Sequence, residues 1–150
     1  QLQLGFLSSG GWDTHINQGG VTGQLANNLS NLSNTLLQLR AAFSEPHDVV
    51  IVASEFGRTC AENGTRGTDH GHGNVMWLMG NGVKGGQWHG RWDGLAADKL
   101  NEGRDLPVHH DFRAVLAQVL FHTLGVTHER IREIFPSYRW DTSLDDLFKA

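Results

Sequence analysis

Cysteine, proline and tyrosine are scarce in this sequence, with one, three and one occurrences among 150 residues. The single cysteine, Cys60, excludes a disulfide within the chain. No apolar run approaches the about 20 residues that a membrane-spanning helix needs. Basic residues are also few and scattered, 12 against 16 acidic residues, which argues against a nucleic-acid or anionic-membrane partner.

Histidine is abundant in comparison, with nine occurrences in a chain whose composition is otherwise ordinary. The apolar content of 39% and mean hydropathy of -0.34 predict a single globular domain over residues 1–150. Five histidines lie beside glycine or an acid in loop-like sequence, where ligand or acid–base roles fit better than packing. They are His15, His70, His72, His89 and one of His109 and His110.

Three apolar runs predict strands at residues 2–8, 49–53 and 75–79, each followed by glycine or polar sequence. Between the first two, leucines spaced by three and four residues over 22–44 predict an amphipathic helix. Strands alternating with helices favour an α/β fold with a parallel or mixed sheet. Three strands make a thin sheet, so the chain is expected to be part of a longer protein or a homodimer.

Two further helices are predicted near the end of the chain. Asp111 is a suitable N-cap for a helix that Gly125 would end, and a short helix is predicted over 128–134.

Acidic and imidazole side chains follow two of the predicted strands. Asp13 and His15 come after the first strand, and Asp69, His70 and His72 lie in the glycine-rich loop after the second. Capping aspartates and surface histidines are common, so each set alone is a weak signal. Two such sets at strand ends favour one metal site with mixed oxygen and nitrogen ligands, as zinc, manganese or iron prefers.

Two charged residues beside these sets have open interpretations. Glu55 directly follows the second strand and is a third oxygen ligand, a group that orients one, or an exposed carboxylate. Arg58 either binds a substrate anion through its planar fork or forms an ion pair with Glu55 or Glu62. Glu55, Arg58 and His72 are the candidate catalytic residues. His89 fits a partly packed position between two tryptophans better than a ligand.

Five motifs in order resemble the bacterial domain-of-unknown-function 1501 family, which is sulfatase-like and placed in the alkaline-phosphatase superfamily. They lie at residues 10–15 (Gly-Gly-Trp-Asp-Thr-His), 54–59 (Ser-Glu-Phe-Gly-Arg-Thr), 67–74 (Gly-Thr-Asp-His-Gly-His-Gly-Asn), 80–86 and 111–115. The resemblance implies an α/β/α sandwich with a small, mostly parallel sheet and a centre of one or two Zn²⁺ or Mn²⁺ ions that hydrolyses phosphate or sulfate esters. Many members of the family are exported, which suggests a periplasmic location.

The resemblance also suggests how ligands are shared between two ions. Asp13, His15 and either His70 or His72 match the first ion. For the second ion, Asp69 with His70 resembles the Asp-His-Gly of sulfatases, whereas Glu55 is the acid that directly follows a strand. The Glu55 assignment is favoured because position at a strand end is a physical requirement.

The chain lacks the more N-terminal strand that carries the covalent nucleophile in the superfamily, so it resembles the C-terminal, truncated portion of that fold. The leading hypothesis is therefore a hydrolase of phosphate, phosphotriester or sulfate esters that uses a metal-activated water on a small anionic or ester substrate. The alternatives are a non-catalytic metal- or anion-binding fragment of a larger enzyme, and a metal-dependent carboxylesterase or lactonase.

Overall fold

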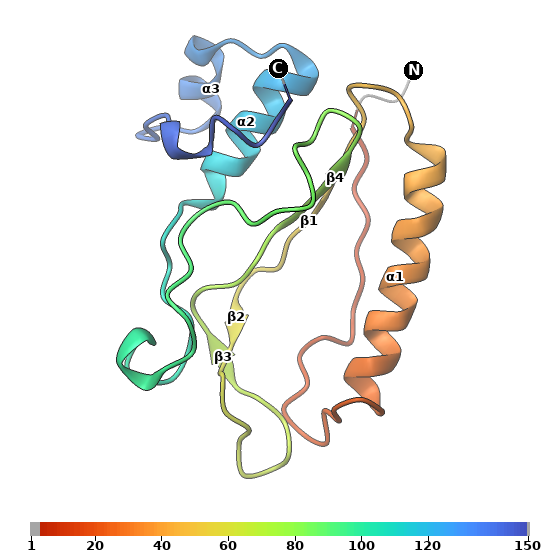
Figure 1. Ribbon diagram of the computed structural model, residues 1–150, viewed down its shortest axis with the longest axis vertical. Helices are drawn as coiled ribbons and strands as arrows, with labels where there is room; N and C mark the ends of the chain where they lie inside the picture. The colour runs from red at the N-terminus through yellow and green to blue at the C-terminus, as the bar shows by residue number, and fades with distance from the viewer. Residues whose placement is uncertain (1–3, 150) are drawn as a thin grey trace.

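A computed structural model describes residues 4–149 of the chain (Figure 1). Its elements, in order, are α1 (Gln24–Ala42), β1 (Val49–Val52), β2 (Gly57–Arg58), β3 (His70–Gly71), β4 (Trp77–Gly80), the 3₁₀ helix η1 (Ala97–Lys99), α2 (Phe112–Leu124), α3 (His128–Ile134) and the 3₁₀ helix η2 (Thr142–Leu144).

Two antiparallel ladders form the sheet structure of the described residues. β1 pairs with β4, from Val49 opposite Gly80 to Val52 opposite Trp77. β2 pairs with β3 and places Arg58 opposite His70. The strand predicted at 49–53 is confirmed, and the one predicted at 75–79 begins two residues later. The α/β/α sandwich with a mostly parallel sheet stays a prediction.

The strand predicted at residues 2–8 is wrong for residues 4–8, which have no strand, while residues 2 and 3 lie outside the described residues. Leu4, Phe6 and Leu7 keep 78%, 91% and 74% of their surface exposed. A strand exists only when a neighbouring backbone accepts and donates its hydrogen bonds, and no such bond joins 4–8 to another described segment. The apolar run alone therefore predicted a strand without a partner.

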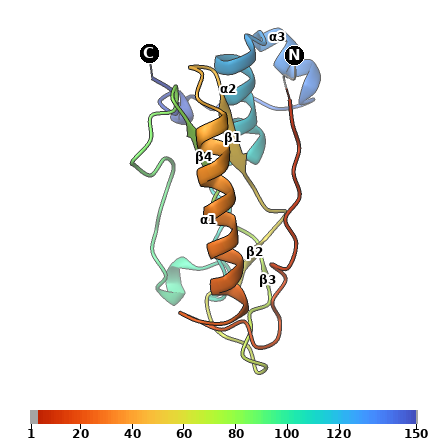
Figure 2. The same cartoon turned by 90° about the vertical axis from the view of Figure 1, so that its right-hand side faces the viewer.

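Helix α1 confirms the helix predicted over 22–44, and it runs lengthwise along one side of β1 and β4 (Figures 1 and 2). Its apolar stripe is only half-buried. No residue of α1 is fully buried, and Leu29 and Phe43 keep 44% and 40% of their surface exposed. The stripe therefore identified the helix correctly but overestimated its burial.

The buried core lies instead among α2, α3 and the C-terminal segment, which gather at one end of the molecule (Figure 1). Asp111 caps α2 by accepting a hydrogen bond from the Arg113 backbone N–H, and Gly125 ends it at a φ of 64°. Both predicted caps are therefore confirmed, as is the helix over 128–134. The buried apolar residues are Val83, Ala114, Ala117, Ile131, Tyr138, Leu144, Leu147 and Phe148. Among residues 4–149, no helix combines the length and apolarity that crossing a membrane requires.

Candidate metal centre

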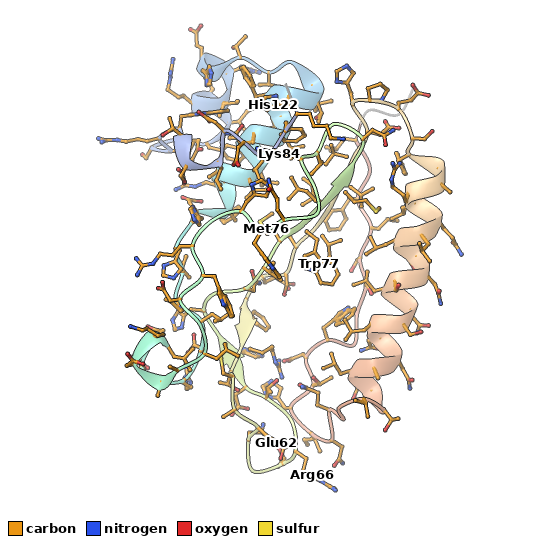
Figure 3. The ribbon with its side chains drawn as sticks, viewed as in Figure 1. Glu62, Arg66, Met76, Trp77, Lys84 and His122 are labelled. Carbon is orange, nitrogen blue, oxygen red and sulfur yellow. The ribbon has the colours of Figure 1, made fainter. Side chains whose placement is uncertain are left out.

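Backbone hydrogen bonds fasten the segment after residue 12 to the loop between β2 and β3. The Thr68 N–H donates to the Thr14 carbonyl at 3.2 Å, and the Gln18 N–H donates to the Arg66 carbonyl at 2.8 Å. Gly67 is buried between these contacts. Figure 1 shows the two segments side by side, and Figure 3 places Glu62 and Arg66 at the far end of the loop. Two stretches about 50 residues apart are thus held in contact.

Asp13, His15 and His70 converge at this junction. Asp13 Oδ1 lies 2.9 Å from His15 Nε2 and 2.8 Å from His70 Nε2, and the two imidazole nitrogens are 3.1 Å apart. Among residues 4–149, these three form the one group of metal-ligand side chains with all donor atoms within 4.8 Å. One face of an octahedral site with bonds of about 2.1 Å has edges of about 3.0 Å. The triangle therefore has the size of a facial metal site.

The hydrogen bond on the other side of His15 fixes the tautomer of its ring. His15 Nδ1 lies 3.0 Å from Asp69 Oδ1, and a carboxylate accepts, so Nδ1 carries the proton. With the proton on Nδ1, the Nε2 of His15 faces Asp13 Oδ1 and His70 Nε2 as an acceptor. The same Asp13 oxygen also accepts a hydrogen bond from Arg58. Two imidazole nitrogens and one carboxylate oxygen are a donor set that fits a divalent transition-metal ion.

Asp69 orients His15 through a hydrogen bond to the ring nitrogen Nδ1, and its carboxylate lies outside the group of three. Asn63 Nδ2 donates to the same Asp69 oxygen at 3.0 Å and to the His15 carbonyl at 3.0 Å. The Asn63 hydrogen bond, followed by that of His15, lowers the pKa of Asp69 below its usual value. Asp69 was predicted as a ligand, and the structure gives it the position of an outer carboxylate that fixes the histidine tautomer.

Arg58 is the positively charged side chain beside the group of three. Its guanidinium pairs with Asp13 Oδ1, and its Nε donates to Thr68 Oγ1 at 3.0 Å. The hydrogen bond from His70, followed by that from Arg58, lowers the pKa of Asp13. Arg58 therefore forms an ion pair, but with neither Glu55 nor Glu62, the partners in one of its two interpretations, since the carboxylate that it reaches comes from the other segment. The β2–β3 ladder explains this geometry because it holds Arg58 opposite His70.

Residues 2–135 match the family model described as "Protein of unknown function (DUF1501)". The chain belongs to the DUF1501 family. No curated protein and no solved structure matches it.

Two predicted site residues of this DUF1501 protein lie outside the group of three. Glu55 is exposed in the turn between β1 and β2. His72 contacts Asp105 instead, with its Nδ1 3.0 Å from Asp105 Oδ2. Between the two histidines that sequence left open as the distant ligand, the structure brings His70, and not His72, to Asp13 and His15.

The remaining candidate histidines have acidic partners elsewhere in the molecule. His89 keeps 13% of its side chain exposed and lies 3.1 Å from Asp146, so it is packed as favoured. Trp88 and Trp92, the tryptophans expected to flank it, keep 83% and 65% of their surface exposed. His109 pairs with Asp93 at 3.1 Å, and His110 pairs with Asp141 at 3.2 Å. Cys60 is a free, exposed thiol outside the centre.

Asp105 is a polar residue whose importance the sequence did not reveal. The side chain of Asp105 is 0% exposed and accepts hydrogen bonds from the backbone N–H and ring of His72 at 2.6 Å and 3.0 Å. A Cβ on Gly71 would come within 2.7 Å of the Asp105 Cβ. The glycine pattern of the loop thus signalled a close approach by another segment, but not which residue makes it.

Replacing Asp69 with asparagine is expected to weaken Zn²⁺ binding about 10- to 100-fold. The neutral amide would hold the protonated Nδ1 of His15 less firmly, and could present an N–H to it instead of an acceptor. Competition titration against a coloured chelator would measure the change. Glu62→Gln, which removes an exposed carboxylate from the same loop, should bind Zn²⁺ as the wild type does. Equal affinity of Asp69→Asn and wild type would contradict the orienting role.

Replacing Asp105 with asparagine is expected to lower the free energy of unfolding at pH 7 by about 1–3 kcal/mol, because it weakens a charge-assisted hydrogen bond to a backbone N–H. The hydrogen bond from the His72 N–H outweighs the burial of Asp105 and lowers its pKa below the usual 3.8. The carboxylate therefore stabilises the fold fully above that value, and its contribution is lost as the pH falls through the folded pKa.

Urea unfolding between about pH 7 and pH 3 would test this. Asp105→Asn should show a shallower loss of stability with acid than the wild type. Asp98→Asn, which changes a carboxylate with 71% of its side chain exposed in nearby η1, should leave both the stability and its pH dependence unchanged. Parallel acid profiles for the wild type and Asp105→Asn would refute the assignment.

Proposed function

We propose that this DUF1501 protein is a metal-dependent hydrolase of phosphate, phosphotriester or sulfate esters. The observation that supports it is the convergence of Asp13, His15 and His70 within 2.8–3.1 Å of one another beside the Arg58 guanidinium. The sulfatase-like kinship with alkaline phosphatases, and the place of this chain as the C-terminal portion of that fold, belong to the same proposal.

Asp13, His15 and His70 would hold Zn²⁺ or Mn²⁺, since two imidazoles and one carboxylate suit both ions. When bound, the ion would supply Lewis acidity, polarising an ester oxygen and lowering the pKa of a water. The chain's own contribution is to orient its ligands. The Asp69 carboxylate keeps the His15 proton on Nδ1, which leaves Nε2 free to bind. Phe56 stacks on His70 with ring centroids 4.0 Å apart and holds that ring in place.

Arg58 would bind an anionic oxygen of the ester. Its side chain is 23% exposed. Thr68 holds its Nε and Nη2 and Asp13 holds its Nη1, so the guanidinium is fixed and two of its five N–H groups are left for an anion. A planar guanidinium offers paired N–H donors that match two oxygens of a phosphate or sulfate. It would also offset negative charge that builds up on those oxygens during hydrolysis. This preference for anions distinguishes phosphate monoesters and diesters and sulfate esters from neutral acyl esters. For a neutral phosphotriester, Arg58 would act only on charge that develops during hydrolysis.

The test is metal analysis of the purified protein, followed by turnover of an aryl phosphate, an aryl phosphotriester, an aryl sulfate and an aryl acetate. We expect turnover of at least one phosphate or sulfate ester that a chelator abolishes and Zn²⁺ or Mn²⁺ restores. Arg58→Lys should slow hydrolysis of the anionic esters more than that of the acetate. Turnover of the acetate alone would replace the proposal with a carboxylesterase or lactonase.

One observation favours a second candidate, a metal-binding module without catalysis. Within residues 4–149 the structure brings together one group of three ligands, and Glu55, the favoured ligand of a second ion, lies outside it. Bound metal without turnover of any of the four esters would establish this alternative.

A further inference from the structure

A hollow of about 240 Å³ lies far along the chain from the metal centre, between α3 and the turn that follows it. We call it the α3 groove. It is lined by His128, Ile131, Arg132, Tyr138, Arg139 and Trp140. None of these residues belongs to the metal centre.

The floor and wall of the α3 groove are apolar and aromatic. Ile131 and Tyr138 are 1% and 8% exposed, and the ring of Trp140 meets that of His128 edge-on, with centroids 4.3 Å apart. The Trp140 indole N–H donates to Asp145 Oδ1 at 2.7 Å, which fixes the ring in place. Ser137, at a φ of 65°, reverses the chain so that residues 138–140 face α3. The groove therefore has rigid walls suited to a flat ring.

The rim of the α3 groove carries two cations without acidic partners. Arg132 and Arg139 are exposed, and within residues 4–149 neither forms an ion pair with a carboxylate. By contrast, Arg130 on the same helix pairs with Glu133, and Arg113 pairs with Asp111. Guanidinium groups that line an apolar hollow and form no ion pair attract a ligand that is both anionic and apolar.

We propose that the α3 groove binds a small aromatic anion, a single ring that carries a carboxylate, sulfonate or phosphate group. The ring would lie against Trp140 and Ile131, and the anionic group would contact Arg132 and Arg139. A hollow of about 240 Å³ is smaller than the about 300–1,000 Å³ of drug-sized pockets, which favours one ring over a larger ligand. The site does not depend on the proposed hydrolase activity, because it shares no residue with the metal centre.

The test uses benzenesulfonate, which is not an ester, in the presence of a chelator that empties the metal centre. The chain has five tryptophans, and the ¹H–¹⁵N resonance of the Trp140 indole can be assigned from its absence in Trp140→Phe. We expect this resonance to shift saturably on titration, while those of Trp12, Trp77, Trp88 and Trp92 stay in place. Benzoate should give the same pattern, because carboxylate and sulfonate share the required charge.

Variants of the two arginines distinguish recognition of the anionic group from nonspecific binding. Arg132→Gln and Arg139→Gln together should weaken benzenesulfonate binding at least 10-fold, whereas Arg130→Gln, on the same helix but paired with Glu133, should leave it unchanged. The four other indole resonances report whether each variant is folded. An unmoved Trp140 resonance would overturn the proposal. Equal affinity for methanesulfonate, which has no ring, or unchanged affinity in the double variant would also overturn it.

Discussion

Replacing His70 with alanine is expected to lower the affinity for Zn²⁺ by at least about 100-fold, more than the loss of an outer-sphere partner typically costs. The reason is geometric, because His70 supplies one of three donor atoms that lie 2.8–3.1 Å apart, and two ligands alone bind a divalent ion weakly. Competition titration against a coloured chelator measures the affinity, and ester turnover should fall with it.

Two further histidine variants make this result specific. His72→Ala removes the neighbouring imidazole, which contacts Asp105 and not the metal centre, and should change Zn²⁺ affinity less than about threefold. His47→Ala, in the exposed turn before β1, controls for loss of any histidine. If His72→Ala lost as much affinity as His70→Ala, the ligand group would differ from the one that the structure assembles.

Much of the helical structure could be predicted because its signals are local. The Asp111 side chain reaches a backbone N–H two residues away, and Gly125 adopts a backbone conformation that other residues disfavour. Both facts depend on neighbours along the chain. The strand predicted at residues 2–8 failed over 4–8 because a strand depends on a partner that the apolar pattern cannot identify.

The candidate site likewise has features that the sequence predicted and features that depend on contacts between distant segments. Residue types and flanking glycines predicted that Asp13 and His15 meet His70 or His72, and the structure brings His70 to them, although the strand expected before Asp13 is absent over residues 4–8. The role of Asp69 and the partner of Arg58 depend on how two loops cross and which way each side chain turns. Spacing along the chain carries no information on either. The sequence therefore named the three grouped residues only within a larger set that also held Glu55, Asp69 and His72, and it could not predict their supporting contacts.

Replacing Gly67 with alanine is expected to damage both the fold and the metal centre, although Gly67 has no side chain to contribute to either. It is buried where the β2–β3 loop crosses the first segment, and an added Cβ would meet the His15 carbonyl and the Thr14 oxygen far inside the 3.0 Å that Cβ atoms keep. Backbone atoms cannot rotate away as a flexible side chain can, so the two segments must separate.

We expect Gly67→Ala to lower the free energy of unfolding by about 1–3 kcal/mol, as overpacking of a buried site does. We also expect weaker Zn²⁺ binding even at temperatures where the variant is fully folded, because moving the His15 backbone pulls its ring away from His70. Urea unfolding and chelator competition measure the two effects. Gly64→Ala is the matched control, since it lies in the same loop and its added Cβ would meet nothing within 4 Å. A Gly67→Ala protein with the stability and Zn²⁺ affinity of the wild type would show that the two segments do not need this close crossing to hold the ion.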